Sequence, residues 1–250
     1  MIRYYCSGFD NINAFGHGMG DMLKDEIKDN NSLVCIPASS NTEKTIEKYI
    51  PLFTSEFKKF GIEFDKVVLL DSDYDKSESK KIVRNASIII LMGGDPFYQK
   101  ELCEKLGIID ELKKYNGVMI GISAGAMLMS KYIIITPCSS EYPSFRIEEG
   151  MNLDNISIYP HNNTDKEEYP KEIVLDDEIY KKDDLIKVAK KYGNFYLLQD
   201  YYIEDGLVDI SYIKIVDGKL EYHYENNGKI WICNKDGITL LNGGIKWIKN

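Results

Sequence analysis

Two almost wholly apolar runs, at residues 87–92 (SIIILM) and 117–122 (GVMIGI), constrain the fold of this chain more than any other feature. Such runs are typical of strands that are covered on both faces, as in parallel sheets. Further apolar runs at residues 2–6, 33–36 and 67–70 are separated from one another by longer stretches with helical spacing. Because strands that alternate with helices imply crossover connections, we expect an α/β fold with a mostly parallel sheet flanked by helices.

Helix signals lie between these strands. The sequence SNTE at residues 40–43 is typical of a helix N-terminus, and apolar residues follow it at helical spacing from Ile46 to Phe57. A second helical stretch, over residues 102–112, is expected to break at Gly107.

The C-terminal part of the sequence has a different character. From about Leu207, short Tyr-, Ile- and Trp-rich runs alternate with Asp-Gly and Asn-Gly turns, a pattern that predicts an antiparallel meander. No repeat or linker interrupts the 250 residues, a length that fits one large domain. We therefore expect a single α/β domain over residues 1–250.

Charge and cysteine content exclude several classes of partner. The formal net charge of −9 argues against nucleic acid or an anionic membrane, since phosphates are bound by clustered Lys and Arg. No apolar stretch approaches the length that spans a bilayer. The five cysteines are scattered and form no CxxC pair, so neither a metal site nor a disulfide framework is indicated. We expect a cytoplasmic protein without a cofactor, and the sequence leaves a homodimer open.

The sequence Gly121-Ile122-Ser123-Ala124-Gly125 has the pattern G-x-S-x-G between a buried strand and an apolar helix. In that context the pattern predicts a nucleophile elbow, a tight turn that exposes the serine hydroxyl above the sheet. The helix N-terminus that follows favours developing negative charge. The alternative is a packing turn whose small residues merely let strand and helix approach.

A serine nucleophile needs a base, and the chain has three histidines. His17 lies in a glycine-rich sequence that predicts a loop and His223 in the C-terminal meander, whereas His161 follows the apolar run ISIYP. We therefore expect His161 at the carboxyl end of a strand, on the same sheet edge as Ser123. It is the best candidate for the base, with a structural histidine as the alternative.

Tetrahedral intermediates are stabilised by two backbone donors. Ala124, the residue after the nucleophile, supplies one candidate, and the segment Gly93-Gly94-Asp95 at the end of a predicted strand supplies another. The same segment also predicts a helix start with Asp95 as N-cap and Pro96 as first helical residue, and both interpretations can hold together.

Three segments, SIIILMGGDPFYQKEL, GVMIGISAGAM and ISIYPH, resemble in order and spacing the dipeptidase E/cyanophycinase family of serine peptidases. The resemblance covers roughly residues 2–205. It implies a flavodoxin-like fold similar to the class I glutamine amidotransferases, with Ser123 as nucleophile, His161 as base, and Gly94 and Ala124 as oxyanion donors. It also implies hydrolysis of a small peptide without a cofactor. Known members of the family cleave either dipeptides with an N-terminal aspartate or aspartate-rich polymers.

The resemblance also bears on an acid and a substrate-binding residue. It places an acid after a late strand, which falls on Asp200, whereas a second aspartate of the family falls near Cys138, with Glu141 the closest acid. An acid bonded to the histidine fixes its tautomer. Only three arginines occur, and Arg146, between nucleophile and base, is the candidate for binding an acidic substrate.

Two alternatives stay open beside the peptidase. A glutamine amidotransferase would use the same elbow with a cysteine nucleophile, which Ser123 disfavours. A non-catalytic binding or sensor protein on the same scaffold is the second alternative, because the sequence offers two candidates for the acid, Asp200 and Glu141. Cys6, Cys35 and Cys103 are poor nucleophile candidates, because they fall within buried strands or on a helix.

Overall fold

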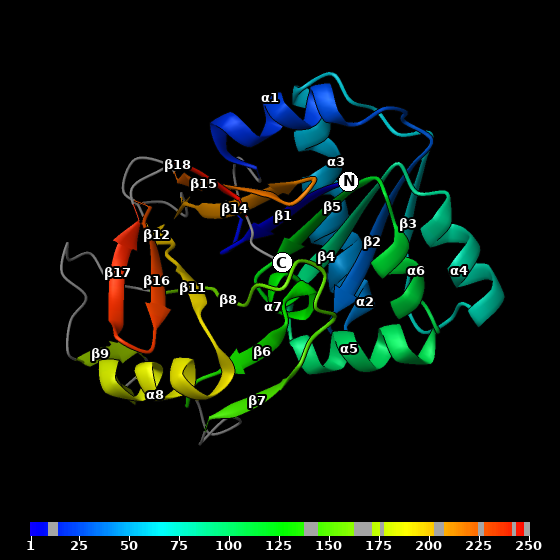
Figure 1. Cartoon of the computed structure of the whole chain (residues 1–250). Helices are drawn as coiled ribbons and strands as arrows, with labels where there is room; N and C mark the ends of the chain where they lie inside the picture. The colour runs from blue at the N-terminus through cyan, green and yellow to red at the C-terminus, as the bar shows by residue number, and fades with distance from the viewer. Residues whose placement is uncertain are drawn as a thin grey trace.

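An eight-stranded sheet, in the order β18-β15-β14-β1-β5-β4-β2-β3, forms the centre of the molecule (Figure 1). Its five consecutive strands from β1 to β3 in this order are mutually parallel: β1 (Ile2–Cys6), β5 (Val118–Ile122), β4 (Ile88–Gly94), β2 (Ser32–Ala38) and β3 (Lys66–Leu69). The predicted α/β fold with a mostly parallel sheet is confirmed.

The structure is a computed structural model that describes residues 1–9, 15–137, 145–162, 172–175, 178–202, 208–224, 228–241 and 244–247.

Helices cover both faces of this sheet, and strand β4 shows why its sequence is apolar throughout. Successive side chains of a strand point to opposite faces. Ile88 and Ile90 pack with helices α1 (Gly16–Glu26) and α3 (Ile50–Lys59), whereas Ile89 and Leu91 pack on the other face. That second face is covered by α4 (Lys76–Arg84), α5 (Pro96–Lys105), α6 (Ile109–Lys114) and α7 (Ala124–Met129).

The helix expected after residue 43 is interrupted. A short helix α2 (Thr42–Lys44) passes through a π-helical turn (Thr45–Tyr49) into α3, and Asn41 is the N-cap. Pro51 near the start of α3 has no N–H and its ring crowds the preceding turn, which explains the widened turn. The wider turn shifts the helical register, and Ile46, expected on the buried face, is 55% exposed.

The second helical stretch breaks as expected. Helix α5 ends at Lys105 and α6 begins at Ile109, with Gly107 between them at φ 66°, in the left-handed region that favours glycine.

The antiparallel strands of the C-terminal part are divided between two sheets. Three of them extend the large sheet: β14 (Ser211–Val216), β15 (Lys219–Tyr224) and β18 (Gly244–Trp247). Two more belong to a second sheet of order β17-β16-β11-β8: β17 (Gly237–Leu241) and β16 (Ile230–Asn234). The other strands of that sheet are β11 (Phe195–Leu198) and β8 (Ile158–Tyr159). Turn signals predict which strands follow one another, but burial against distant strands decides which sheet each one joins.

Helix α8 (Lys182–Tyr192) packs on the second sheet, which lies to the left of the large one in Figure 1. The remaining strands form short antiparallel pairs: β6 (Tyr132–Ile135) with β7 (Arg146–Glu149), β9 (Glu172–Leu175) with β10 (Glu178–Lys181), and β12 (Tyr201–Tyr202) with β13 (Val208–Asp209). Within the described ranges, no helix has the length and apolar character to cross a membrane.

A buried ion pair fixes α7 relative to β1. The N–H groups of Met151 and Leu153 donate to carbonyls in the last turn of α7, which have no partners within the helix. The next residue, Asp154, accepts hydrogen bonds from Arg3 Nη1 at 2.7 Å and from the Tyr5 hydroxyl at 2.6 Å. The side chains of Arg3 and Asp154 are both almost fully buried. Their ion pair therefore anchors residues 151–154, which contact the end of α7, to strand β1.

Candidate active site

Ser123 lies on the turn between β5 and α7 and has φ 50° and ψ −106°. A residue with a side chain rarely adopts a positive φ, and such a conformation costs on the order of 1–3 kcal/mol. Main-chain bonds hold the turn: the Ser123 N–H donates to the Cys6 carbonyl at 3.0 Å, and the Ser123 carbonyl accepts from Met127 at 3.0 Å. The geometry is that of the predicted elbow.

The two glycines of the motif let α7 approach the sheet closely. A Cβ at Gly125 would lie 2.1 Å from the carbonyl oxygen of Leu91 in β4. A Cβ at Gly121 would lie 2.5 Å from the sulfur of Met129 and 2.8 Å from the backbone nitrogen of Ala126. Either side chain would push the helix away from the sheet and move the residue between them.

Ser123, His161 and Asp200 form a continuous hydrogen-bonded chain. The Ser123 Oγ lies 2.7 Å from His161 Nε2, and His161 Nδ1 lies 2.5 Å from Asp200 Oδ2. An ionised carboxylate can only accept, so Nδ1 carries the proton and Nε2 presents its lone pair to the serine hydroxyl. The Asp200 side chain is 2% exposed and that of His161 46% exposed. The arrangement can take a proton from Ser123.

The prediction that His161 shares a sheet edge with Ser123 is wrong in one respect. Ser123 follows β5 of the large sheet, whereas His161 and Asp200 follow the neighbouring parallel strands β8 and β11 of the second sheet. Strand β8 has two residues and is defined by its pairing with β11, a contact across almost 40 residues of sequence. The chain of three side chains therefore joins the two sheets.

Two opposing effects act on the pKa of His161. Burial lowers the pKa, whereas the hydrogen bond to Asp200 and the negative charge of that carboxylate raise it. The balance holds the pKa of His161 above its ordinary value of 6.5.

The candidate oxyanion donors lie at the end of β4 and the start of α7. A Cβ at Gly93 would lie 3.6 Å from the Cβ of Ser123, so the end of β4 is next to the nucleophile. Gly94 has φ 141°, and a Cβ there would lie 2.5 Å from the Ala38 carbonyl oxygen, which only glycine avoids. Ala124 is the first residue of α7, and its N–H has no acceptor within the helix.

The helix that follows Gly94 begins as predicted. The Asp95 carboxylate accepts hydrogen bonds from the N–H groups of Phe97 and Tyr98 as N-cap, and Pro96 is the first helical residue.

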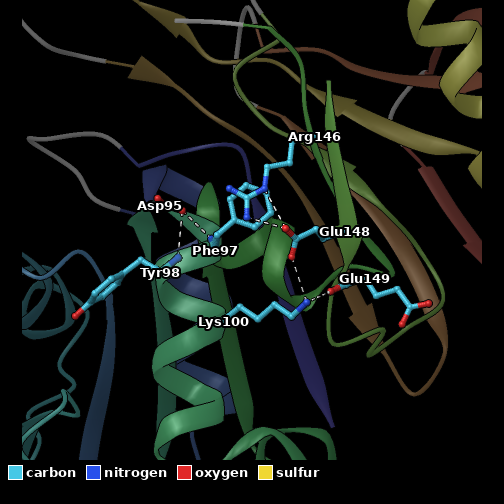
Figure 2. A network of polar contacts seen from close by, with 7 residues as sticks. All are labelled: Asp95, Phe97, Tyr98, Lys100, Arg146, Glu148 and Glu149. Atoms are coloured by element: carbon cyan, nitrogen blue, oxygen red, sulfur yellow. Dashed lines mark hydrogen bonds and ion pairs between the residues drawn. The ribbon is translucent and has the colours of Figure 1, made fainter. Parts of the chain in front are cut away.

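Arg146 lies on β7, and its guanidinium covers the Phe97 ring at 3.4 Å from the ring centroid (Figure 2). Its Nε and Nη2 donate to one carboxylate oxygen of Glu148, at 3.0 and 2.7 Å. Lys100 also pairs with Glu148, at 3.5 Å. The guanidinium thus lies over the first turn of the helix after Gly94 and shares the Glu148 carboxylate with Lys100.

His223 does not take part in this chain of contacts. His223 on β15 stacks on Tyr212 and bonds to Glu221. The loop predicted around His17 is wrong, since His17 lies in helix α1. Glu141 and Cys138 lie outside the described residues.

The buried cysteines are poor nucleophiles. Burial raises the pKa of both Cys35 and Cys103 to about 12, so neither forms a thiolate at neutral pH. In the described part of the chain, no group of three or more His, Cys, Asp and Glu side chains is placed to hold a metal ion.

One residue near the acid was not predicted from the sequence. Gly8, two residues after β1, lies so close to Asp200 that a Cβ there would be 2.9 Å from Oδ2. Gly8 follows β1, which is parallel to β5, so it lies at the same carboxyl edge of the sheet as Ser123. Sites in α/β proteins gather at this edge, and that position is the sequence signal that could have identified Gly8.

Residues 7–188 match the sequence profile of peptidase family S51. None of the curated proteins compared with this sequence matches it. A peptidase from an acI-B1 Actinobacterium has a similar structure, with a TM-score of 0.64 and 18% identity over 99% of this chain and 96% of the other. A Listeria monocytogenes EGD-e protein named as a peptidase E has a TM-score of 0.53 and 14% identity over 99% and 98% of the two chains. At these identities the two structures show a shared fold.

Proposed function

This chain belongs to peptidase family S51 and is a serine peptidase, and we propose that it cleaves a small peptide through an acyl-enzyme on Ser123. His161 takes the proton of Ser123 as the hydroxyl attacks the carbonyl carbon, and Asp200 stabilises the imidazolium that forms. The amides of Gly94 and Ala124 hold the oxyanion. His161 then returns the proton to the leaving amine, and water releases the product acid.

The observation that carries this proposal is the chain of hydrogen bonds from Ser123 through His161 to Asp200, at 2.7 and 2.5 Å. A binding protein has no need of a strained serine within reach of an imidazole whose second nitrogen is bonded to a buried carboxylate. Backbone strain at Ser123, with φ 50°, supports the same interpretation, because such strain is concentrated at functional sites.

Substrate size and charge are the finer part of the proposal. A dipeptide with an N-terminal aspartate is the first substrate to test, with Arg146 as the group that would receive its carboxylate. Glu148 already binds this guanidinium through two N–H groups, so an acidic substrate must compete with it. We therefore expect only a modest preference, about tenfold or less, for Asp-Xaa over Ala-Xaa dipeptides.

A fluorophosphonate probe tests the nucleophile independently of the substrate. We expect the folded protein to be labelled stoichiometrically at Ser123, identified by mass spectrometry of the modified peptide, because the probe reacts only with an activated serine. A panel of Asp-Xaa and Ala-Xaa dipeptides then measures hydrolysis directly. A protein that stays unlabelled and cleaves none of the panel would be the non-catalytic binding protein instead.

The pH dependence of hydrolysis tests the base. His161 must be neutral to accept a proton, so activity is lost as pH falls through its pKa, which Asp200 holds above 6.5. We expect kcat/KM to rise with pH and to level off with an apparent pKa above that value. An acid limb centred below about pH 6 would contradict the role of an Asp200-bound histidine as the base.

A further inference from the structure

The main chain next to Asp200 is held on several sides. The carbonyl of Leu198 accepts from the N–H of Asn162, the neighbour of His161, at 2.9 Å. The N–H of Gln199 donates to the carbonyl of Lys229 at 3.0 Å. The end of β11 is therefore bonded both to the segment that carries the imidazole and to the segment before β16.

A side chain from the large sheet completes this set of contacts. The hydroxyl of Ser211, at the start of β14, donates to the carbonyl of Gln199 at 2.8 Å. Ser211 is fully buried and is itself fixed, since its N–H donates to Ser7 Oγ at 3.1 Å and its carbonyl accepts from the Ser7 N–H at 2.9 Å. The residue before Asp200 is thus tied through Ser211 to the end of β1.

The same end of β1 contacts both the acid and the nucleophile. The Cys6 carbonyl accepts from the Ser123 N–H at 3.0 Å, and Gly8 leaves the space that the Asp200 carboxylate fills. Segment 6–8 is therefore the common support of two residues that come from different sheets. A shift of either one relative to this support would change the distance between His161 and its partners.

We propose that Ser211 and Gly8 are positioning residues for Asp200: Ser211 holds the neighbouring main chain by its hydroxyl, and Gly8 gives the carboxylate room beside β1. This inference rests on the proposed function and extends it, because it names the contacts that set the acid against the imidazole across the boundary between two sheets. Neither residue belongs to the predicted catalytic set, and both act through Asp200 rather than on the substrate.

The test is the kinetic behaviour of Ser211→Ala in the full-length protein. Loss of the hydroxyl releases the Gln199 carbonyl, so we expect kcat to fall about 10- to 100-fold, the cost of a small misplacement, with KM changed less than about twofold. The acid limb of kcat/KM is expected to move to lower pH, because a looser Asp200 contact raises the His161 pKa less. Ser211→Thr keeps a hydroxyl and is expected to recover part of kcat.

Ser79→Ala is the matched control. Ser79 is also fully buried and donates its hydroxyl to a backbone carbonyl, that of Asp75, but it lies in α4. We expect Ser79→Ala to keep the wild-type kcat and pH profile. Equal kinetic losses in the two variants, or a Ser211→Ala variant whose kcat and pH profile match wild type, would overturn the inference.

Gly8→Ala and Ser211→Thr test the inference if Ser211→Ala does not fold. Gly8→Ala places a methyl group against Asp200 and is expected to lower kcat to a similar degree. In an Asp200→Asn background, Gly8→Ala and Ser211→Thr are expected to change kcat less than about twofold, because their effects pass through the same carboxylate. If either substitution lowered kcat as much in the Asp200→Asn background as in the wild-type background, the inference would be contradicted.

Failure of the proposed function gives a different result from failure of this inference. If the proposed function is wrong, the wild-type protein itself is neither labelled by the fluorophosphonate nor active on the peptides.

Discussion

Alanine in place of Ser123 is expected to abolish peptide hydrolysis, with kcat/KM at least about 10,000-fold below wild type. The substitution removes the nucleophile, and only the oxyanion donors and substrate binding can still contribute. Main-chain bonds from Ser123 to Cys6 and Met127 hold the elbow and survive the change, so the fold is expected to persist. The measurements are dipeptide hydrolysis and fluorophosphonate labelling, with circular dichroism and thermal melting to establish the fold.

Ser55→Ala serves as the control for this substitution. Ser55 is an exposed residue of α3 whose hydroxyl bonds to the Leu52 carbonyl, and its replacement is expected to leave kcat/KM unchanged. A folded Ser123→Ala variant that hydrolyses the panel as fast as wild type would refute Ser123 as the nucleophile.

Several features around the elbow could be predicted from the sequence because their signals lie in consecutive residues. The run at residues 87–92 has both faces buried by helices and is apolar at successive positions, so its place inside the sheet follows from composition. The glycines that flank Ser123 and the Asp95-Pro96 helix start are recognised from a few consecutive residues, although the need for glycine at position 125 comes from its contact with Leu91 in β4. Pattern and structure agree for these features, but a local signal is not always enough: the π-helical turn before Pro51 exposes Ile46, which was expected on the buried face.

The second sheet could not be predicted in the same way. Its strand β8 has two residues, pairs with β11 and depends on β16, which lies more than 70 residues further along the chain. Nothing near His161 in the sequence specifies that pairing. Likewise, Gly8 and Asp200 are 192 residues apart, and only the folded chain brings them together. His161 is predicted from its place after an apolar run and Asp200 from the family resemblance, but the contacts that support these two residues are not.

Asparagine in place of Asp200 is expected to lower kcat/KM by about 10,000-fold while leaving the side-chain volume unchanged. The buried carboxylate accepts the proton of His161 Nδ1 and so leaves Nε2 free to accept from Ser123. An asparagine amide can instead donate to Nδ1, which selects the tautomer with the proton on Nε2. That tautomer cannot take the proton of Ser123.

Fluorophosphonate labelling of the Asp200→Asn variant is expected to slow in parallel with hydrolysis, because both reactions require the activated serine. Asp75→Asn is the matched control: Asp75 caps α4 through hydrogen bonds to the N–H groups of Ser77 and Glu78, and asparagine caps helices equally well. It should leave both rates unchanged. Wild-type rates in a folded Asp200→Asn variant would remove Asp200 from the mechanism and return Glu141 as the candidate acid. A large loss of hydrolysis and labelling in Asp200→Asn, with no loss in Asp75→Asn, would support the buried Asp200 carboxylate as the group that orients the imidazole.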